Sequence, residues 1–175
     1  MSAPIVISID PGIRGCGVAL FNSGTKLLLR AAYVKNADPK GAGLEEQMEM
    51  ARCVLFWAFQ GEKTGGTVHT LVAEWMQIYP GRGVDPNTSL LPLIGVVAHL
   101  SGAYPWRDRV SYQPKAWKGT VDGDVMTDRI QERLTPDELL NIEPCPASLQ
   151  HNVFDGIGIG LKHLGRLERR RVYAR

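Results

Sequence analysis

Apolar runs broken by turn residues occupy the start of the chain. Residues 5–9 form a β-rich apolar run that stops at Asp10, where a proline and a glycine follow, so a buried strand ending in a turn is expected. Residues 15–21 predict a second strand that doubles back, and the turn residues 22–24 predict a hairpin into a third strand at residues 26–33. The fold is therefore expected to begin with three antiparallel strands.

Helical and strand patterns alternate after this opening. Residues 44–60 carry apolar side chains at helical spacing, and residues 68–73 form a β-type run that presents Glu74 at its end. A second helix is expected to begin at Asn87 or Thr88, either of which could cap it. Glu74 is thus a second carboxylate, after Asp10, at the end of an apolar strand.

The last part of the chain completes an α/β pattern. Residues 109–112 predict a fifth strand, and residues 113–119 predict a loop. A threonine, a proline and two acids predict the start of a helix at residues 135–142, and a final helix is expected at residues 147–166. The order βββαβαβα favours a mixed five-stranded sheet flanked by helices. No repeat or linker is visible, so residues 1–175 are expected to form one domain.

Composition is that of an ordinary globular domain. The chain has 175 residues, of which 44% are hydrophobic and 22% charged. No apolar run approaches the roughly 20 residues that a membrane helix needs, and the N-terminus lacks a leader pattern. Cys16, Cys53 and Cys145 are odd in number and far apart, which argues against a disulfide framework and a zinc site. A cytosolic protein without a membrane partner is expected.

Basic residues gather at the C-terminal end although the net charge is only +2. Residues 162–175 contain the run Arg169-Arg170-Arg171 and a single acid, Glu168. A basic tail from about residue 166 could neutralise DNA phosphates, or it could be a solvated chain end. The sequence leaves both interpretations open.

Three carboxylates stand where burial would be costly. Asp10 and Glu74 end apolar strands, and Asp155 lies in an unusually apolar helical segment. Buried unpaired carboxylates cost several kcal/mol, so a group of them implies a bound cation. Oxygen ligands without thiolates favour Mg²⁺ or Mn²⁺. Taken singly, Asp10 could form a turn, Glu74 could end a strand in solvent, and Asp155 could pair with Lys115 or Lys118. Only the fold decides whether the three acids meet.

The order and spacing of these segments resemble the RuvC family of Holliday-junction resolvases. The resemblance rests on segments that carry or follow the acids, namely 7–12 (ISIDPG), 15–19 (GCGVA), 72–74 (VAE), 155–160 (DGIGIG), and Asn87, Leu90 and Gly95. The first segment resembles the family's first-strand motif, the third its second acidic motif, and the fourth the aspartate of its last helix. The resemblance covers about residues 5–164.

This resemblance implies a ribonuclease-H-like (RNase H-like) fold and a metal-dependent DNA endonuclease. It implies a homodimer that nicks a four-way DNA junction symmetrically, with two divalent ions, Mg²⁺ or Mn²⁺, in each active site. Asp10 would bridge both ions, and Glu74 and Asp155 would complete the sites. The protein would act in the cytoplasm of a bacterial cell, or of a phage's host. The alternative function is a non-catalytic branched-DNA-binding module of the same fold.

The family's fourth metal ligand lies three residues before the last aspartate. This chain has Asn152 there, with His151 one residue earlier. Positions three and four residues apart share a helical face, so either side chain could reach the metal site beside Asp155. We favour His151, because imidazole is the better metal ligand and can also carry a proton.

Candidate DNA-binding residues lie in two loops and in the basic tail. The loop after the second acidic motif carries Tyr79 and Arg82. The resemblance implies an aromatic side chain near Tyr79 that stacks at the junction, and the alternative is an aromatic packed on its own loop. Lys115 and Lys118 flank Trp117 and suit contact with phosphates, whereas Trp117 itself is expected in the core.

The helix after the second acidic motif is more apolar than its own core side requires. Its extra apolar side chains are candidates for part of a dimer interface, and they are Leu93, Ile94, Val97 and Leu100.

Overall fold

A five-stranded mixed sheet forms the centre of the molecule in the computed structural model, which describes residues 4–37, 41–60, 69–77 and 90–168. The strands are β1 (Ile5–Asp10), β2 (Gly15–Asn22), β3 (Leu28–Lys35), β4 (Thr70–Glu74) and β5 (Asp108–Tyr112). They lie in the order β3-β2-β1-β4-β5. The first three pair antiparallel, and β4 pairs parallel with both β1 and β5. The predicted α/β fold with three opening antiparallel strands is confirmed.

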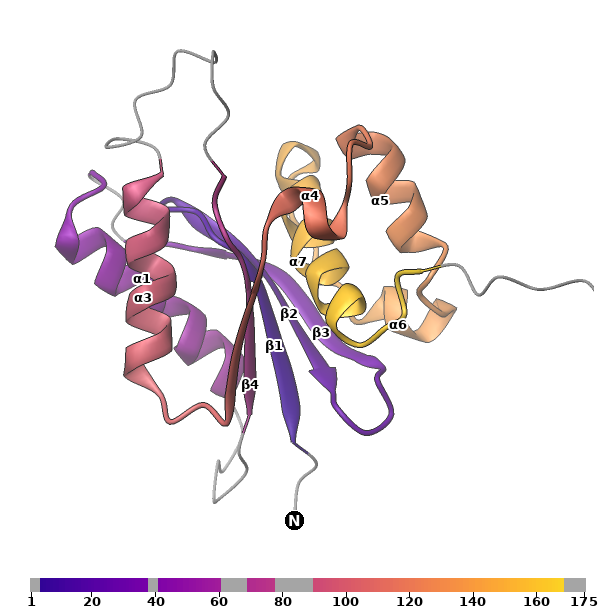
Figure 1. The fold of residues 1–175 in the computed structure, drawn as a ribbon, viewed down its shortest axis with the longest axis horizontal. Coiled ribbons are helices and arrows are strands. Elements are labelled where there is room, and N and C mark those ends of the chain that lie inside the picture. Colours follow the sequence, from indigo (N-terminus) through magenta and orange to yellow (C-terminus); the bar gives the residue numbers. More distant parts are fainter. Residues whose placement is uncertain (1–3, 38–40, 61–68, 78–89, 169–175) are drawn as a thin grey trace, which may run out of the picture.

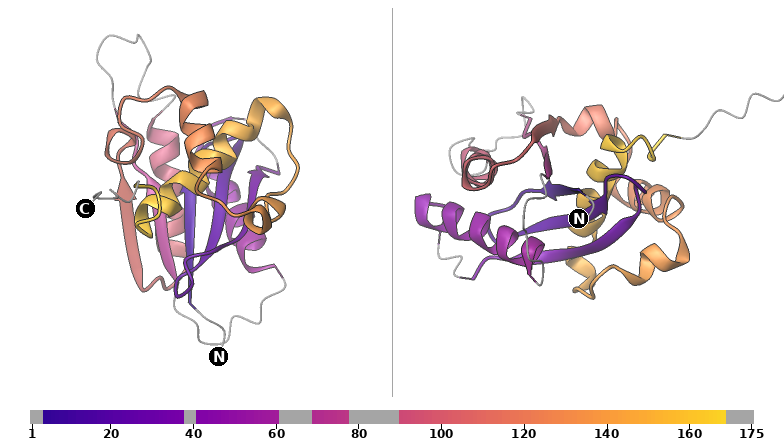
Figure 2. Two further views of the ribbon diagram at one scale, coloured as in Figure 1. Left: turned by 90° about the vertical axis from the view of Figure 1, so that its right-hand side faces the viewer. Right: turned by 90° about the horizontal axis from the view of Figure 1, so that it is seen from below.

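Helices cover both faces of this sheet (Figure 1). On one side lie α1 (Leu44–Phe59) and α3 (Leu91–Ala103). The other side is covered by the later helices, which are α4 (Pro114–Trp117), α5 (Gly123–Gln131), α6 (Pro136–Leu140), the 3-10 turn η1 (Ala147–Leu149) and α7 (Gln150–His163). Figure 2 shows α7 lying across the sheet, with the two helix layers on opposite sides. No helix among the described residues is long and apolar enough to cross a membrane.

The sheet therefore separates two hydrophobic cores. The alternation of side chains along β1 shows the division. The odd positions from Ile5 to Ile9 belong to the core beneath α1 and α3, and Val6 belongs to the core beneath α7. Ser8 also faces α7, because its hydroxyl donates to the backbone oxygen of Gly156 at 2.7 Å. A strand that places its even positions toward α7 places its last residue, Asp10, there as well.

Three sequence expectations need correction. The segment 113–119 is not only a loop, because α4 forms within it. Helix α5 was not expected, because only Met126 and Ile130 among its side chains are buried and mark its apolar face weakly. Val97 and Leu100 are buried in the chain's own core, so the prediction that they form a dimer interface is wrong. The expected caps of α3, Asn87 and Thr88, lie outside the described residues.

The helix start predicted at Thr135 is confirmed in detail. The Thr135 hydroxyl accepts from the backbone of Glu138, and the Glu138 carboxylate accepts from the backbone of Thr135, which is a capping box. Glu138 is buried and also binds Arg166, with Nη1 2.6 Å from Oε1, and the backbone N–H of Leu28. Arg166, the first residue of the predicted basic tail, therefore ties the end of α7 to α6 and β3.

Candidate active site

Asp10 and Glu74 stand beside each other at the ends of two parallel strands. In the register of β1 and β4, Ile9 lies opposite Ala73, so the next residue of each strand is one of the acids. Side chains alternate along strands, so both acids belong to the face covered by α7. The sequence expectation that each of these carboxylates ends an apolar strand is confirmed, and the structure shows that the two strands are neighbours.

Asp155 reaches the two strand ends because α7 lies unusually close to the sheet. A Cβ added to Gly156 would stand 2.7 Å from the backbone oxygen of Gly17, and one added to Gly17 would stand 1.7 Å from the backbone oxygen of Asn152. Neither position has room for a larger residue without a shift of the backbone. The turn of α7 that carries Asp155 therefore rests directly on β2, next to β1.

The three acids, which we call the acid cluster, act on one another electrostatically. Burial raises the pKa of Asp10 well above its usual value, the charges of Glu74 and Asp155 raise it further, and Lys118 lowers it in part. Burial also raises the pKa of Glu74, against the opposing effects of Lys118 and Trp117. Three carboxylates against one ammonium leave the cluster short of positive charge.

Lys118 supplies that ammonium. Its Nζ lies 3.1 Å from Oδ2 of Asp155 and 3.8 Å from Oε2 of Glu74. Burial disfavours a charged lysine, but the attraction of Asp155 and Glu74 outweighs it and raises the pKa of Lys118. The side chain therefore remains charged and lies where a cation can neutralise two of the three acids. The sequence offers Lys118 as a DNA-binding residue and as a partner of Asp155, and the ion pair is present.

Trp117 fixes the carboxylate of Glu74. Its indole Nε1–H donates to Oε2 of Glu74 at 2.7 Å. The indole is buried against Gly158 of α7, and Nζ of Lys118 lies 4.9 Å from the ring centroid. The prediction that Trp117 belongs to the core is confirmed. Its hydrogen bond to Glu74 was missed, because no local pattern connects two residues so far apart in the sequence.

The short helix α4 delivers both side chains to the cluster. Because β5 pairs parallel with β4, with Tyr112 opposite Glu74, the chain leaves β5 beside the acids. Pro114 then occupies the first turn of α4, where its fixed φ is compatible with a helix. The backbone N–H of Lys118 donates to the oxygen of Pro114 at 2.9 Å and closes this turn.

The remaining predicted site residues either form no hydrogen bond or ion pair with the acids or lie outside the described chain. His151 is exposed and Asn152 half-buried in the first turn of α7. Within the part of the chain that the structure describes, no hydrogen bond or ion pair joins either side chain to the acid cluster. Lys115 is exposed on α4. The predicted DNA-binding residues that lie outside the described ranges are Tyr79, Arg82, Arg169, Arg170 and Arg171.

The donor set of the acid cluster suits a hard divalent cation. All three side chains offer carboxylate oxygens, which Mg²⁺ and Mn²⁺ prefer. Among the described residues, no three Asp, Glu, His or Cys side chains are gathered closely enough to hold one ion together, and Lys118 contacts two of the acids. The chemistry therefore fits a metal, and the side chains around Lys118 must rearrange to hold one.

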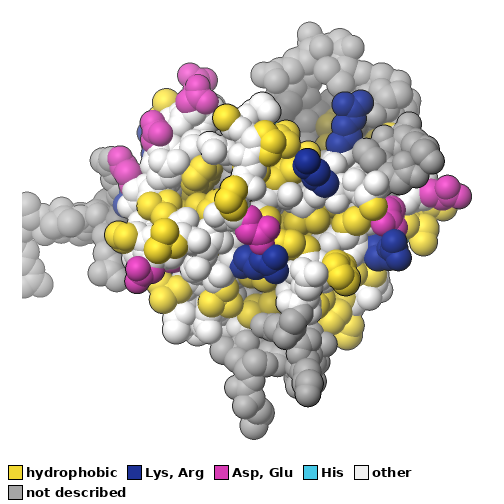
Figure 3. All heavy atoms as spheres, turned by 180° about the vertical axis from the view of Figure 1, so that it is seen from behind, with side chains coloured by type: hydrophobic (Ala, Val, Ile, Leu, Met, Phe, Trp, Pro, Cys, Tyr) yellow, Lys and Arg dark blue, Asp and Glu magenta, His cyan; other side chains and the backbone are white. Residues whose placement is uncertain are grey.

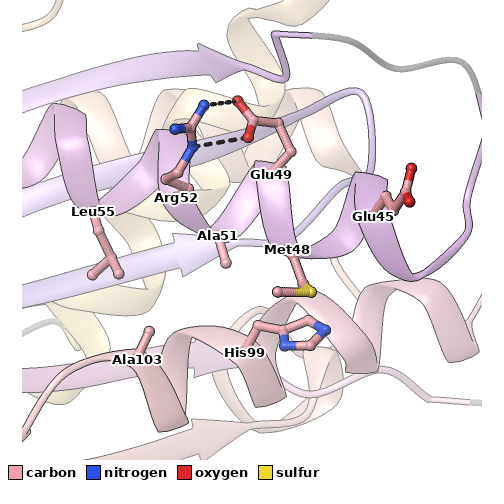
Figure 4. Close-up of a pocket in the computed structure, with 8 residues that line it drawn as sticks. All are labelled: Glu45, Met48, Glu49, Ala51, Arg52, Leu55, His99 and Ala103. Atoms are coloured by element: carbon pink, nitrogen blue, oxygen red, sulfur yellow. Dashed lines mark hydrogen bonds and ion pairs between the residues drawn. The ribbon is translucent and has the colours of Figure 1, made fainter.

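A hollow on the opposite side of the sheet has a different character. It lies between α1 and α3 and has a volume of about 640 Å³ (Figure 4). Four apolar side chains line it together with four charged or polar ones, Glu45, Glu49, Arg52 and His99. Arg52 and Glu49 pair with each other at 2.9 Å, and His99 faces Met48 across the hollow. The two acids that line it, Glu45 and Glu49, both come from α1, and Glu49 is paired with Arg52, so the acid cluster is the better candidate for catalysis.

Fold and site together define an RNase H-like α/β domain whose carboxylates meet at the ends of its first and fourth strands. No protein-family model matches the chain, and no curated protein does. Solved structures do match. Thermus thermophilus RuvC aligns with a TM-score of 0.55 and 17% identity, covering 91% of this chain and 92% of that chain.

The same Thermus protein in complex with a Holliday junction substrate aligns with a TM-score of 0.60 and 20% identity, over the same 91% and 92%. The yeast mitochondrial Holliday junction resolvase aligns with a TM-score of 0.49 and 12% identity, over 93% of this chain and 81% of that chain. The two Thermus structures show that this chain has the RuvC-like fold that its sequence motifs led us to expect.

Proposed function

We propose that this protein is a divalent-metal-dependent DNA endonuclease that resolves four-way junctions. The observation that carries the proposal is the convergence of Asp10, Glu74 and Asp155 from three separate elements into one cluster short of positive charge. A fold shared with RuvC, which has been solved on a Holliday junction substrate, supports the choice of DNA substrate. The reaction is hydrolysis of a phosphodiester in each of two strands.

Each residue of the cluster has a separate task in this proposal. Asp10, Glu74 and Asp155 would hold the metal, which when bound supplies Lewis-acid activation of water and stabilisation of the leaving oxygen. Trp117 keeps one oxygen of Glu74 in place, so that the carboxylate needs little reorganisation. Lys118 neutralises the acids before metal binds and is then free to contact the phosphate beside the scissile bond.

A cleavage assay on a synthetic four-way junction tests this function. We expect paired nicks at symmetric positions in two strands, dependent on Mg²⁺ or Mn²⁺, and no comparable cutting of a linear duplex built from two of the arms. Equal cutting of junction and duplex would contradict the choice of substrate. Binding without any cleavage would favour the second candidate, a non-catalytic branched-DNA-binding module. The observation that favours this candidate is that Lys118 already pairs with Glu74 and Asp155.

Symmetric cutting requires two active sites related by a twofold axis, so we propose a homodimer. Its interface cannot use Val97 and Leu100, which are buried inside the protomer. The mass of the protein at micromolar concentration, with and without junction DNA, tests this point. A strictly monomeric mass in both conditions contradicts it.

The fourth metal ligand remains a choice between His151 and Asn152, and we propose His151. The two single alanine variants should be compared at saturating Mn²⁺, with junction binding measured in parallel. His151→Ala is expected to slow cleavage far more than Asn152→Ala, because imidazole can ligate the metal and carry a proton. Cleavage by His151→Ala at the parent rate would transfer the role to Asn152 or to water.

A further inference from the structure

A basic hollow lies next to the acid cluster and is lined in part by the segment that follows β5. Its volume is about 710 Å³, and α4, α5 and the end of α7 form its walls. Five basic side chains line it against one acid, Glu168, and they are Lys115, Lys118, Arg129, Arg133 and Lys162. We call this hollow, defined by these five basic residues, the basic groove.

Most of the positive charge in the basic groove is not neutralised by the protein. Within the described chain, Lys115, Arg129 and Arg133 form no ion pair. Nε of Arg133 is buried and makes no hydrogen bond. Arg129 lies in the last turn of α5 and Arg133 in the turn that follows the helix, and both line the hollow. Such an arrangement leaves guanidinium groups ready for an external anion.

Two of the five cations are paired, because Lys118 contacts Glu74 and Asp155 and Lys162 contacts Glu168. Lys162 and Glu168 form their ion pair at 2.8 Å, and Glu168 is 78% exposed. An exposed pair of this kind contributes little to stability, and an incoming phosphate can replace the carboxylate. Glu168 therefore acts as a weak competitor for the anion that the basic groove binds.

The basic groove is continuous with the acid cluster through one side chain. Lys118 lines the groove and also contacts Glu74 and Asp155. A neighbouring hollow lined by Glu74, Lys115 and Lys118 lies along the same segment, residues 114–123. A chain of phosphates with one member at the acid cluster would therefore reach the groove with its next members.

We propose that the basic groove binds the phosphodiester backbone of the DNA strand that continues from the scissile phosphate. This inference rests on the proposed endonuclease function and specifies which surface holds the substrate arm. A nucleic-acid strand carries one charge per about 3.4 Å of axis, so it can engage several of the five cations at once, whereas a single small anion can engage only one or two. The opposite face of the sheet offers no equivalent, since its hollow carries Glu45, Glu49 and Arg52.

Fluorescence anisotropy with a labelled four-way junction, over a series of salt concentrations, tests the proposal. The double variant Arg129→Gln/Arg133→Gln is expected to bind about tenfold more weakly, with a salt slope smaller by about 0.9 for each phosphate that the variant no longer neutralises. Arg129→Lys/Arg133→Lys, which keeps both charges, should recover most of the affinity. Arg52→Gln, which changes an arginine on the opposite face, should bind as the parent does.

Glu168→Gln provides a test of opposite sign. Removing the competing carboxylate should strengthen junction binding by about twofold to threefold at low salt. Circular dichroism melts should show every variant folded at the assay temperature.

The failure of this proposal can be told apart from failure of the proposed function. If the parent binds and cuts the junction while the Arg129→Gln/Arg133→Gln variant keeps its affinity and salt slope, the groove assignment is overturned. A Glu168→Gln variant that binds more weakly would also overturn it. If the parent binds an RNA duplex as tightly as the DNA junction, the assignment to DNA is wrong. A parent that binds the junction through these arginines but never cuts it contradicts the endonuclease function alone.

Discussion

The two sides of the sheet differ in the side chains that pack on them. One side lies beneath α1 and α3, and the other lies beneath α7. The first is packed almost entirely by apolar side chains, such as Met50 and Val54 of α1 and Leu100 of α3. The second also has a hydrophobic core, but polar groups reach into it at Ser8 and at the acid cluster. On the face seen from behind in Figure 3, basic and acidic side chains lie scattered among apolar ones.

The difference shows how one strand can serve both stability and chemistry. Strands β1 and β4 place aliphatic residues toward α1 and α3, and they place their terminal acids toward α7. The cost of bringing carboxylates together falls only on the α7 side, where Lys118 and Trp117 compensate for part of it. Changes on the two sides should therefore have different consequences, and matched variants can separate them.

The largest effect is expected from the acids themselves. Glu74→Gln and Asp155→Asn should each slow junction cleavage by on the order of a hundredfold to a thousandfold at saturating metal, because charge stabilisation in the transition state is removed. Neither variant should melt at a lower temperature, since each relieves repulsion within the cluster. Glu49→Gln on α1 is the control from the other side and should cleave within about twofold of the parent. An equal loss in Glu49→Gln would remove the distinction between the sides.

Acid should weaken the α7 side through Glu138. Burial alone would raise the pKa of Glu138, but hydrogen bonds from Arg166 and from the backbone N–H groups of Leu28 and Thr135 outweigh it and lower the pKa to about 2. A folded-state pKa below the unfolded value means that this stabilisation is complete above about pH 4.5 and is lost as the pH falls toward 2. It amounts to at most about 3 kcal/mol.

Urea denaturation between pH 6 and pH 3 measures this contribution. The parent should lose stability across the window, and Glu138→Gln should start lower and lose less. Glu143→Gln serves as the comparison, because the pair of Glu143 with Arg30 is more exposed to solvent than the pair of Glu138 with Arg166 and should contribute less. A parallel loss in the parent and in Glu138→Gln would show that other groups cause the acid sensitivity.

A smaller effect is expected from the glycines of the two helix layers. Gly156→Ala should destabilise the protein by about 1–3 kcal/mol, because the new methyl group meets the backbone of Gly17 at 2.7 Å. Gly102→Ala in α3 should be neutral or stabilising by up to about 1 kcal/mol, because no atom lies within 4 Å of the new methyl group. Thermal melts compare the two. Equal destabilisation by the two variants would mean that the close contact of α7 with β2 is not what excludes a larger side chain at position 156.

The smallest of these effects concerns the indole that holds Glu74. Trp117→Phe keeps the ring in the core and removes the hydrogen bond, so Mn²⁺ affinity measured by calorimetry should fall by about tenfold. Trp106→Phe is a matched control on the other side, because that indole is equally buried, at 5% exposure, and donates to the backbone oxygen of Leu100 at 2.7 Å. Both variants should lose stability, but only Trp117→Phe should lose metal affinity. If both variants keep the same metal affinity, Trp117 contributes to packing but not to metal binding.

Features with a local cause could be predicted from the sequence. The apolar runs that end at Asp10 and Glu74 indicate strand ends directly, because alternation and turn residues are local signals. The capping box at Thr135 was visible for the same reason. The resemblance to the RuvC family then predicted that Asp155 lies beside Asp10 and Glu74. Spacing along the sequence alone could not predict this.

What the sequence could not supply depends on contacts between distant segments. Trp117 reaches Glu74 across 43 positions of the chain, and Lys118 reaches Asp155 across 37. Arg129 and Arg133 could not be recognised as a pair, because α5 was itself not predicted and the walls of the basic groove come from three separate elements. The apolar residues Val97 and Leu100 were misassigned because the sequence does not reveal how much of α3 the sheet and α1 cover.

The most direct test of the central claim is a paired measurement of binding and cleavage for Asp10→Asn. Asp10 is the acid whose pKa both other members of the cluster raise, and it lies on the strand between β2 and β4. With a labelled four-way junction and Mg²⁺, the parent is expected to bind and cut. Asp10→Asn is expected to bind within about threefold of the parent, since phosphate contacts elsewhere supply the affinity, and to cut at no detectable rate. Cleavage by Asp10→Asn at the parent rate would contradict the assignment of the acid cluster as the active site.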